Sequence, residues 1–170
     1  MNKYTLKENM KKILIIITVL CIQQTVSAQE IKKIKMAELV KMIDTSSTPL
    51  VISFWASWCA PCIREIPWFE KNVAAADKKI KLVLVSIDFA DDYPKTISAF
   101  VKKNGYRSEI LWLNETNADE FCPQIDKSWD GAIPATLMVN NQTKYRQFFG
   151  NQIPEEKFVL ELKKLTGSGN

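Results

Sequence analysis

The sequence contains no histidine, and it has only four cysteines among its 170 residues. Zinc sites usually need four ligands, most often cysteine or histidine. Once the leader described below is set aside, Cys59 and Cys62 have only one further cysteine, Cys122, to complete such a set. The missing histidine also removes the usual haem ligand and the CxxCH haem-attachment motif. The sequence therefore predicts neither a metal site nor another cofactor.

A large excess of charge of one sign is also missing. The formal net charge is +4, from 23 basic and 19 acidic residues. Residues 1–28 hold four of the basic residues and one of the acidic ones, which leaves 19 and 18, or about +1, for the rest of the chain. So balanced a domain gives no reason to expect binding to nucleic acid or to an anionic surface.

The N-terminal apolar run is too short to span a membrane, which takes ~20 residues. This run, residues 13–22, has ten residues; four lysines precede it, and Val26-Ser27-Ala28 follows it. Basic residues, a short apolar run and small residues at positions −3 and −1 are typical of a secretory signal peptide. We expect residues 1–28 to be this signal peptide, with cleavage after Ala28 and export to the periplasm or the cell exterior. An uncleaved leader that tethers the protein to the membrane is the alternative; a lipoprotein is disfavoured because Leu20 is large for the residue before a lipidated cysteine.

The rest of the chain shows no internal repeat, linker or low-complexity block. A hydrophobic content of 46% is enough to build a core, so we expect one domain at residues 29–166 and a disordered tail at 167–170. The patterns predict strands at 30–35, 50–55, 80–87, 110–113, 135–139 and 145–149. They predict helices at 36–44, 63–76, 93–104, 115–125 and 154–165. Strands that alternate with helices and end in a hairpin and a helix indicate an α/β sheet covered on both faces.

The segment Trp58-Cys59-Ala60-Pro61-Cys62 directly follows the predicted buried strand at 50–55. Cys59 therefore falls at a strand-to-helix junction, and Cys62 lies one turn inside the helix. The unpaired N–H groups and the positive end of a helix stabilise a thiolate, so we expect the pKa of Cys59 to lie below the ordinary value near ~8.5. Pro61 fits an early helical position, where its missing N–H is not needed. The spacing predicts one sulfur that attacks and one that resolves.

The segment from Phe54 to Cys62 resembles the thioredoxin active site. Pro67 stands where thioredoxins carry a helix-kinking proline, and the segment 131–136 resembles the thioredoxin loop whose proline is cis and faces the CxxC. The likeness covers about residues 30–165. The leader, together with a helix and a strand between about Phe89 and Leu113, is similar to the exported TlpA/ResA-like branch. This resemblance implies a thioredoxin fold: a central mixed β-sheet flanked by helices, with an extra helix–strand insertion.

The resemblance also implies roles for individual residues. Cys59 would be the nucleophile, Cys62 the resolving cysteine, and Pro134 the cis-proline of a substrate loop in which a substrate strand lies against Ile133. Further substrate-binding residues would be Trp58, Ala60, Pro61 and Trp129, with core packing an equally open interpretation of Trp129. Cys122 is interpreted as a core residue rather than a third redox group, because it shares an apolar helical face with Ala118, Phe121 and Ile125.

Two positions depart from the family pattern. Ser53 stands where thioredoxins usually place a buried aspartate. Phe89 stands, in our alignment, where ResA-like proteins usually place a glutamate, beside Asp88. Asp88 is therefore the candidate for the proton relay to Cys62.

The resemblance implies a thiol–disulfide oxidoreductase that works as a reductant. Ala60-Pro61 has no histidine of the kind that makes strong oxidants of this fold, so we favour a protein-disulfide reductase over a disulfide oxidase or isomerase. A thiol peroxidase would usually carry threonine at the position of Ala56, and a structural disulfide or a non-catalytic binding module would not need both cysteines in this setting. We expect a monomer that acts on disulfide-containing exported proteins and receives electrons from an upstream, membrane-bound dithiol protein.

Overall fold

The computed structural model describes residues 30–77 and 79–167 of the chain. The predicted signal peptide lies outside these residues, and so does the predicted tail beyond Gly167. The described residues form a six-stranded sheet with the order β1-β4-β3-β2-β5-β6. Its strands are β1 (Lys32–Ile34), β2 (Leu50–Trp55), β3 (Lys81–Ser86), β4 (Glu109–Leu113), β5 (Ala135–Asn140) and β6 (Tyr145–Phe149).

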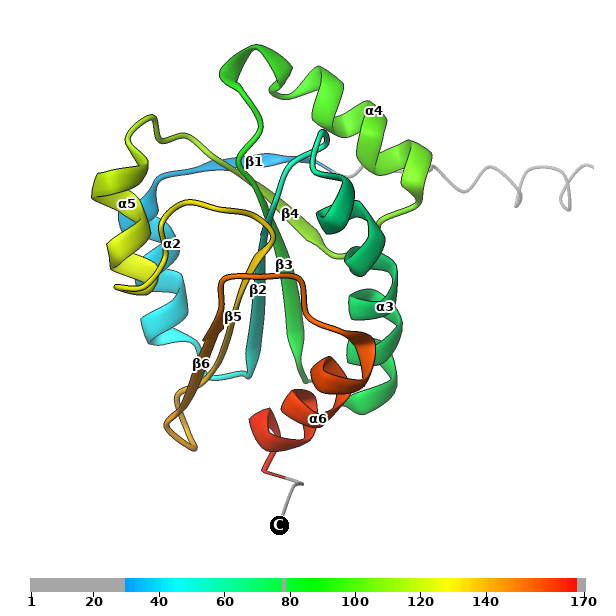
Figure 1. Cartoon of the computed structure of the whole chain (residues 1–170), viewed down its shortest axis with the longest axis vertical. Coiled ribbons are helices and arrows are strands. Elements are labelled where there is room, and N and C mark those ends of the chain that lie inside the picture. The colour runs from blue at the N-terminus through cyan, green and yellow to red at the C-terminus, as the bar shows by residue number, and fades with distance from the viewer. Residues whose placement is uncertain (1–29, 78, 168–170) are drawn as a thin grey trace, which may run out of the picture.

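The sheet is mixed, as the resemblance implied. β1, β4, β3 and β2 are parallel to their neighbours, whereas β5 is antiparallel to both β2 and β6. The five helices of the described residues are α2 (Met36–Thr45), α3 (Ala60–Ala76), α4 (Lys95–Asn104), α5 (Ala118–Ile125) and α6 (Glu155–Leu165), and η1 (Ala90–Asp92) is a short 3-10 turn. Figure 1 shows α2 and α5 on one side of the sheet and α3, α4 and α6 on the other.

The central strand β2 is buried on both faces, which explains its uninterrupted apolar sequence. Val51 and Trp55 belong to the core under α3, α4 and α6. Ile52 and Phe54 belong to the core under α2 and α5. Because side chains alternate along a strand, β2 joins the two cores and delivers its C-terminal end to the start of α3.

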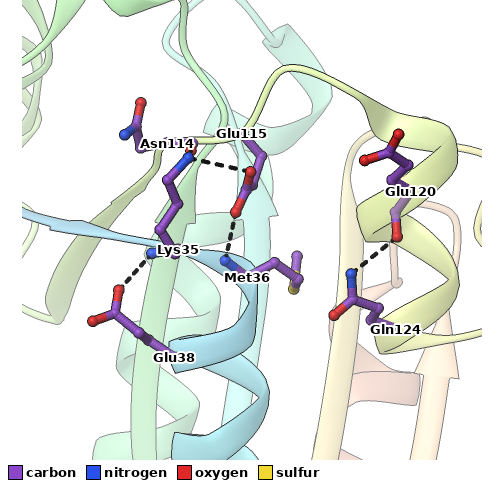
Figure 2. A network of polar contacts seen from close by, with 7 residues as sticks. All are labelled: Lys35, Met36, Glu38, Asn114, Glu115, Glu120 and Gln124. Carbon is purple, nitrogen blue, oxygen red and sulfur yellow. Dashed lines mark hydrogen bonds and ion pairs between the residues drawn. The ribbon is translucent and has the colours of Figure 1, made fainter.

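Two helices begin at least two residues later than the sequence predicts. The helix expected from residue 93 begins at Lys95, because η1 and the cis Tyr93–Pro94 bond come first. The helix expected from residue 115 begins at Ala118, because Glu115 has another partner. Its Oε1 accepts a hydrogen bond of 2.9 Å from the backbone N–H of Met36 at the start of α2, and Figure 2 shows Lys35 reaching the same carboxylate. Glu115 thus caps a different helix from the one to which the sequence assigned it.

Strand β5 runs one residue further than predicted before the turn to β6. Asn140 still pairs with Tyr145, so residues 141–144 form the turn, and Lys144 adopts a positive φ of 58°. The side-chain amide of Asn141 donates to the carbonyl groups of Ile43 and Ser46 at the end of α2, at 2.8 and 3.0 Å. The turn therefore satisfies carbonyl groups that a helix end leaves without partners.

Candidate active site

The two cysteines of the CxxC segment form a disulfide at the N-terminus of α3. Cys59 is the N-cap residue, and its Sγ accepts a hydrogen bond of 3.3 Å from the backbone N–H of Cys62. Their Cα atoms are 5.3 Å apart, and Pro61 occupies the first turn, as predicted. The helix starts at Ala60, three residues before the predicted boundary, so Cys59 caps it and Cys62 lies in its first turn, as the spacing of the segment indicated.

The two sulfurs differ in their access to solvent. Cys59 is 5% exposed, whereas Cys62 is fully buried among core residues under α3. A partner molecule approaching from solvent therefore meets Cys59 first.

The loop before β5 lies beside the end of β2. The Ile133–Pro134 peptide bond is cis, and the next residue, Ala135, pairs with Phe54 of β2. Pro134 is buried, and the half-buried Ile133 packs against both cores. The loop thus lies at the C-terminal end of β2, from which the chain also runs to Cys59. The role of Pro134 in substrate binding stays a prediction.

The two tryptophans expected to face substrate have different surroundings. Trp58 is 55% exposed and stacks on Phe89, the residue that stands where ResA-like proteins usually place a glutamate. Trp129 is 4% exposed; its ring packs on Phe54 at 4.4 Å, and its Nε1 donates to the carbonyl of Ala132. The expectation that Trp129 faces substrate is therefore wrong, because its indole fills the core under α2 and α5.

Asp88 connects the end of β3 to the loop before Cys59. Its buried carboxylate accepts hydrogen bonds from the backbone N–H of Ser57 at 2.9 Å and from the hydroxyls of Ser57 and Ser86, both at 2.6 Å. Its own carbonyl accepts from the indole N–H of Trp112 at 2.8 Å. We call this arrangement the Asp88 clasp. It fixes the loop that presents Cys59.

Glu65 is a buried carboxyl group that sequence reasoning missed. It lies one turn beyond Cys62 on the stripe of α3 that faces the sheet, together with Ile66, Phe69 and Val73. Its Oε2 accepts from the backbone N–H of Ile153 at 3.2 Å, and its Oε1 has no hydrogen-bond partner within the described residues. Burial raises the pKa of Glu65 to about 8, a shift that the hydrogen bond from Ile153 partly offsets. The signal in the sequence was an acidic residue on an otherwise apolar helical face, three positions after Cys62.

Two further polar side chains lie on the same side of the sheet. Ser53 of β2 and Thr136 of β5 are paired in register, and both are fully buried. Ser53 lies between Val51 and Trp55, which both face α3, and neither its hydroxyl nor that of Thr136 has a partner within the part of the chain that the structure describes. Ser53, Thr136 and Glu65 are thus three buried side chains on the α3 side of the sheet, each with an oxygen that has no hydrogen-bond partner among the described residues.

Comparison with known proteins places this site in a family. The family model described as "AhpC/TSA family" matches residues 21–148. The chain belongs to the AhpC/TSA family. A ResA thiol-disulfide oxidoreductase from Oceanobacillus iheyensis is 32% identical over 75 residues, 39% of each chain. A thioredoxin from Haemophilus influenzae is 28% identical over 111 residues, 65% of this chain and 92% of the thioredoxin.

Solved structures agree on the fold of this AhpC/TSA-family protein. A thioredoxin-related protein from Neisseria meningitidis serogroup B superposes with a TM-score of 0.60 and 23% identity, over 72% of this chain and 87% of that one. StoA from Bacillus subtilis superposes with a TM-score of 0.53 and 22% identity, over 73% and 86%. These similarities agree with the resemblance to TlpA/ResA-like proteins of the thioredoxin superfamily found in the sequence.

The third cysteine among the described residues of this AhpC/TSA-family protein, Cys122, lies away from the site. Cys122 is buried in the core under α2 and α5, whereas Cys59 and Cys62 belong to the core on the other face of the sheet. Burial, together with the charges of Asp130 and Asp119, raises the pKa of Cys122 to about 11. The interpretation of Cys122 as a core residue is confirmed. No helix in the described residues is both long and apolar enough to cross a membrane.

Proposed function

We propose that this protein is an extracytoplasmic thiol–disulfide oxidoreductase that reduces disulfides in exported proteins. The observation that carries the proposal is the disulfide between Cys59, a slightly exposed residue at a helix N-cap, and Cys62, which is fully buried one turn later. The N–H of Cys62, which points at the Cys59 sulfur, and the positive end of α3 would stabilise a Cys59 thiolate once the disulfide is reduced. Relatives named ResA thiol-disulfide oxidoreductase support the same activity.

The reaction follows from the positions of the two sulfurs. The Cys59 thiolate attacks the disulfide of the partner protein, forms a mixed disulfide and displaces one partner thiolate. Cys62 then attacks the Cys59 sulfur and releases the second partner thiol. Two electrons pass from the dithiol to the partner, and the Cys59–Cys62 disulfide found in the structure is the product.

We assign the proton transfer at Cys62 to Glu65 rather than to Asp88. Cys62 must lose its proton before it attacks, and a carboxyl group with a pKa of about 8 can accept that proton near neutral pH. The free Oε1 of Glu65 lies on the face of α3 that carries Cys62. The Asp88 carboxylate, expected from the sequence to act here, is engaged by Ser57 and Ser86 and instead holds the loop before Cys59.

The direction of electron flow is proposed from the residues between the cysteines. Ala60 and Pro61 supply no histidine to stabilise the thiolate further, so we expect a reduction potential nearer that of thioredoxin, about −270 mV, than that of DsbA, about −120 mV. The predicted leader supports export, and an upstream dithiol protein in the membrane would then restore the reduced state.

A redox titration of the Cys59–Cys62 pair against glutathione tests the direction. A potential near −120 mV would contradict the reductase assignment. The Cys62→Ser variant should trap partner proteins from an extracytoplasmic extract as mixed disulfides on Cys59, and Cys59→Ser/Cys62→Ser is the control that should trap none. Consumption of hydrogen peroxide at the rate of disulfide exchange would indicate the thiol peroxidase alternative instead.

A further inference from the structure

Two large apolar side chains are exposed side by side next to the reactive cysteine. Trp58 is 55% exposed and Phe89 is 69% exposed, and their rings stack with centroids 6.0 Å apart and planes 23° apart. Leu160 on α6 is the other large apolar side chain that the described residues expose. Exposed apolar groups that cluster beside a reactive atom indicate an interaction site rather than chance exposure.

Hydrogen bonds between the two segments that carry Trp58 and Phe89 hold the backbone of the aromatic pair in place. The backbone N–H of Ile87 donates to the carbonyl of Trp55 at 2.8 Å, and the Asp88 clasp joins Ser57 to the end of β3. Trp58 and Phe89 are the next residues on these two joined segments. The pair is therefore preorganised, so binding a partner there loses little conformational entropy.

Two aspartates follow Phe89 closely in the chain. Asp91 and Asp92 lie on η1, directly after the aromatic pair, and Asp91 is exposed. Neither carboxylate forms an ion pair with any residue that the structure describes. A partner that places a basic side chain here would gain a charge interaction that the protein itself does not supply.

We propose that Trp58 and Phe89 form a docking platform for an extended segment of a disulfide-bonded partner protein. The segment carries an aromatic or large aliphatic residue next to its cysteine, which packs on the platform, and a lysine or arginine farther along, which faces Asp91. The inference rests on the proposed function, because disulfide exchange is what brings a partner cysteine to Cys59. In that exchange, Cys59 bonds to the partner sulfur, the other partner sulfur leaves as a thiolate, and Cys62 then closes the disulfide with Cys59 and releases the partner thiol.

The test compares two disulfides that share one leaving group. One is hydroxyethyl disulfide; the other is a synthetic peptide with phenylalanine next to its cysteine and lysine two residues farther on, the cysteine being bonded to 2-mercaptoethanol. In the reduced protein, Phe89→Ser should lower the second-order rate constant for the peptide about tenfold more than that for hydroxyethyl disulfide. Leu160→Ser, which removes a similarly exposed side chain on α6, is the matched control and should leave the ratio of the two constants unchanged.

The charge component is tested with a second peptide in which glutamate replaces the lysine. Asp91→Asn should reduce the preference for the lysine peptide about threefold at low salt, and this difference should shrink as salt screens the charges. An equal effect of Phe89→Ser on both disulfides, or an effect no larger than that of Leu160→Ser, overturns the platform. An unchanged preference in Asp91→Asn overturns the basic partner residue.

Failure of the proposed function would look different. In that case the reduced wild type would exchange with neither disulfide faster than free cysteine does. Docking is then measured without exchange, by calorimetric titration of the oxidised protein with the lysine peptide carrying serine in place of cysteine. Weaker binding to Phe89→Ser than to the wild type supports the platform, and equal binding overturns it.

Discussion

At the scale of single residues, the main finding is a carboxyl group buried beside the disulfide. Glu65 has one hydrogen bond for its two oxygens among the described residues, and its side chain is fully buried. Desolvation disfavours its charged form and raises its pKa from 4.5 to about 8. The raised pKa makes Glu65 suitable as a proton acceptor. The same desolvation lowers the free energy of unfolding when Glu65 is ionised.

This cost predicts a pH dependence of stability. The folded-state pKa of Glu65 is above the unfolded value, so its contribution is most favourable below pH 4.5 and is lost as the pH rises through about 8. We expect the free energy of unfolding of the oxidised protein to fall across this window by on the order of 4 kcal/mol relative to Glu65→Gln. Denaturant unfolding at a series of pH values measures it, with the exposed Glu156→Gln as control. Parallel pH profiles for the wild type and Glu65→Gln would contradict the assignment.

The same substitution predicts a kinetic effect. In Glu65→Gln the attack of Cys59 on a partner disulfide should change little, because Cys59 is activated by the helix N-terminus. Release of the mixed disulfide by Cys62 should slow about 100-fold near pH 7, the lower range for losing a general base. Stopped-flow measurement of both steps separates them. If Asp88→Asn slows release and Glu65→Gln does not, Asp88 is the proton acceptor.

At the scale of elements, the Asp88 clasp joins two segments that the sheet alone does not hold together. It links the loop after β2 to the end of β3, immediately before Cys59. Hydrogen bonds to a buried charged group each contribute about 1.5–3 kcal/mol. The clasp therefore stabilises the loop conformation that presents the reactive sulfur and the aromatic pair.

A double-mutant cycle tests this coupling. Ser57→Ala and Asp88→Asn should each lower the free energy of unfolding, by about 1–3 kcal/mol. Combined, they should cost at least about 0.5 kcal/mol less than the sum, because both variants disrupt the hydrogen bond from the Ser57 hydroxyl to Asp88. Strict additivity in denaturant unfolding would show that the two groups do not interact.

The elements themselves were largely predictable, whereas their ends and the buried polar groups were not. Apolar runs and helical periodicity indicated each strand and helix, because the spacing of apolar residues along the sequence shows which face of an element is buried. The late start of α5 was not predictable, since it depends on Glu115 capping α2 from a distant part of the chain. The stacking of Phe89 on Trp58 and the burial of Trp129 likewise follow from strand pairing rather than from neighbouring residues.

The candidate site shows the same division. The CxxC pair at a helix N-terminus could be predicted, because the strand, the cysteines and the helix are consecutive. Glu65 could not, since its environment is completed by Ile153, 88 residues later. Spacing shows which face of a helix a residue occupies, and only the fold shows what closes over that face.

At the scale of the whole molecule, the sheet separates the redox pair from the third cysteine. Cys122 should therefore be dispensable for exchange. We expect Cys122→Ala to lower the free energy of unfolding by about 1–2 kcal/mol through loss of buried volume, without changing the rate of disulfide exchange. Unfolding and exchange kinetics measured on one preparation check both parts. Loss of exchange in a folded Cys122→Ala variant would place Cys122 in the reaction after all.

The unequal burial of Cys59 and Cys62 determines the order in which reaction partners can react with the protein. Because Cys59 is slightly exposed and Cys62 is fully buried, the electron donor and the electron acceptor must both react at Cys59, one after the other. The protein cannot bind the electron donor and the disulfide substrate at the same time. Steady-state turnover should therefore follow ping-pong kinetics, with parallel lines in double-reciprocal plots. The electron donor and the disulfide substrate would then compete for Cys59, and an excess of either one would slow turnover.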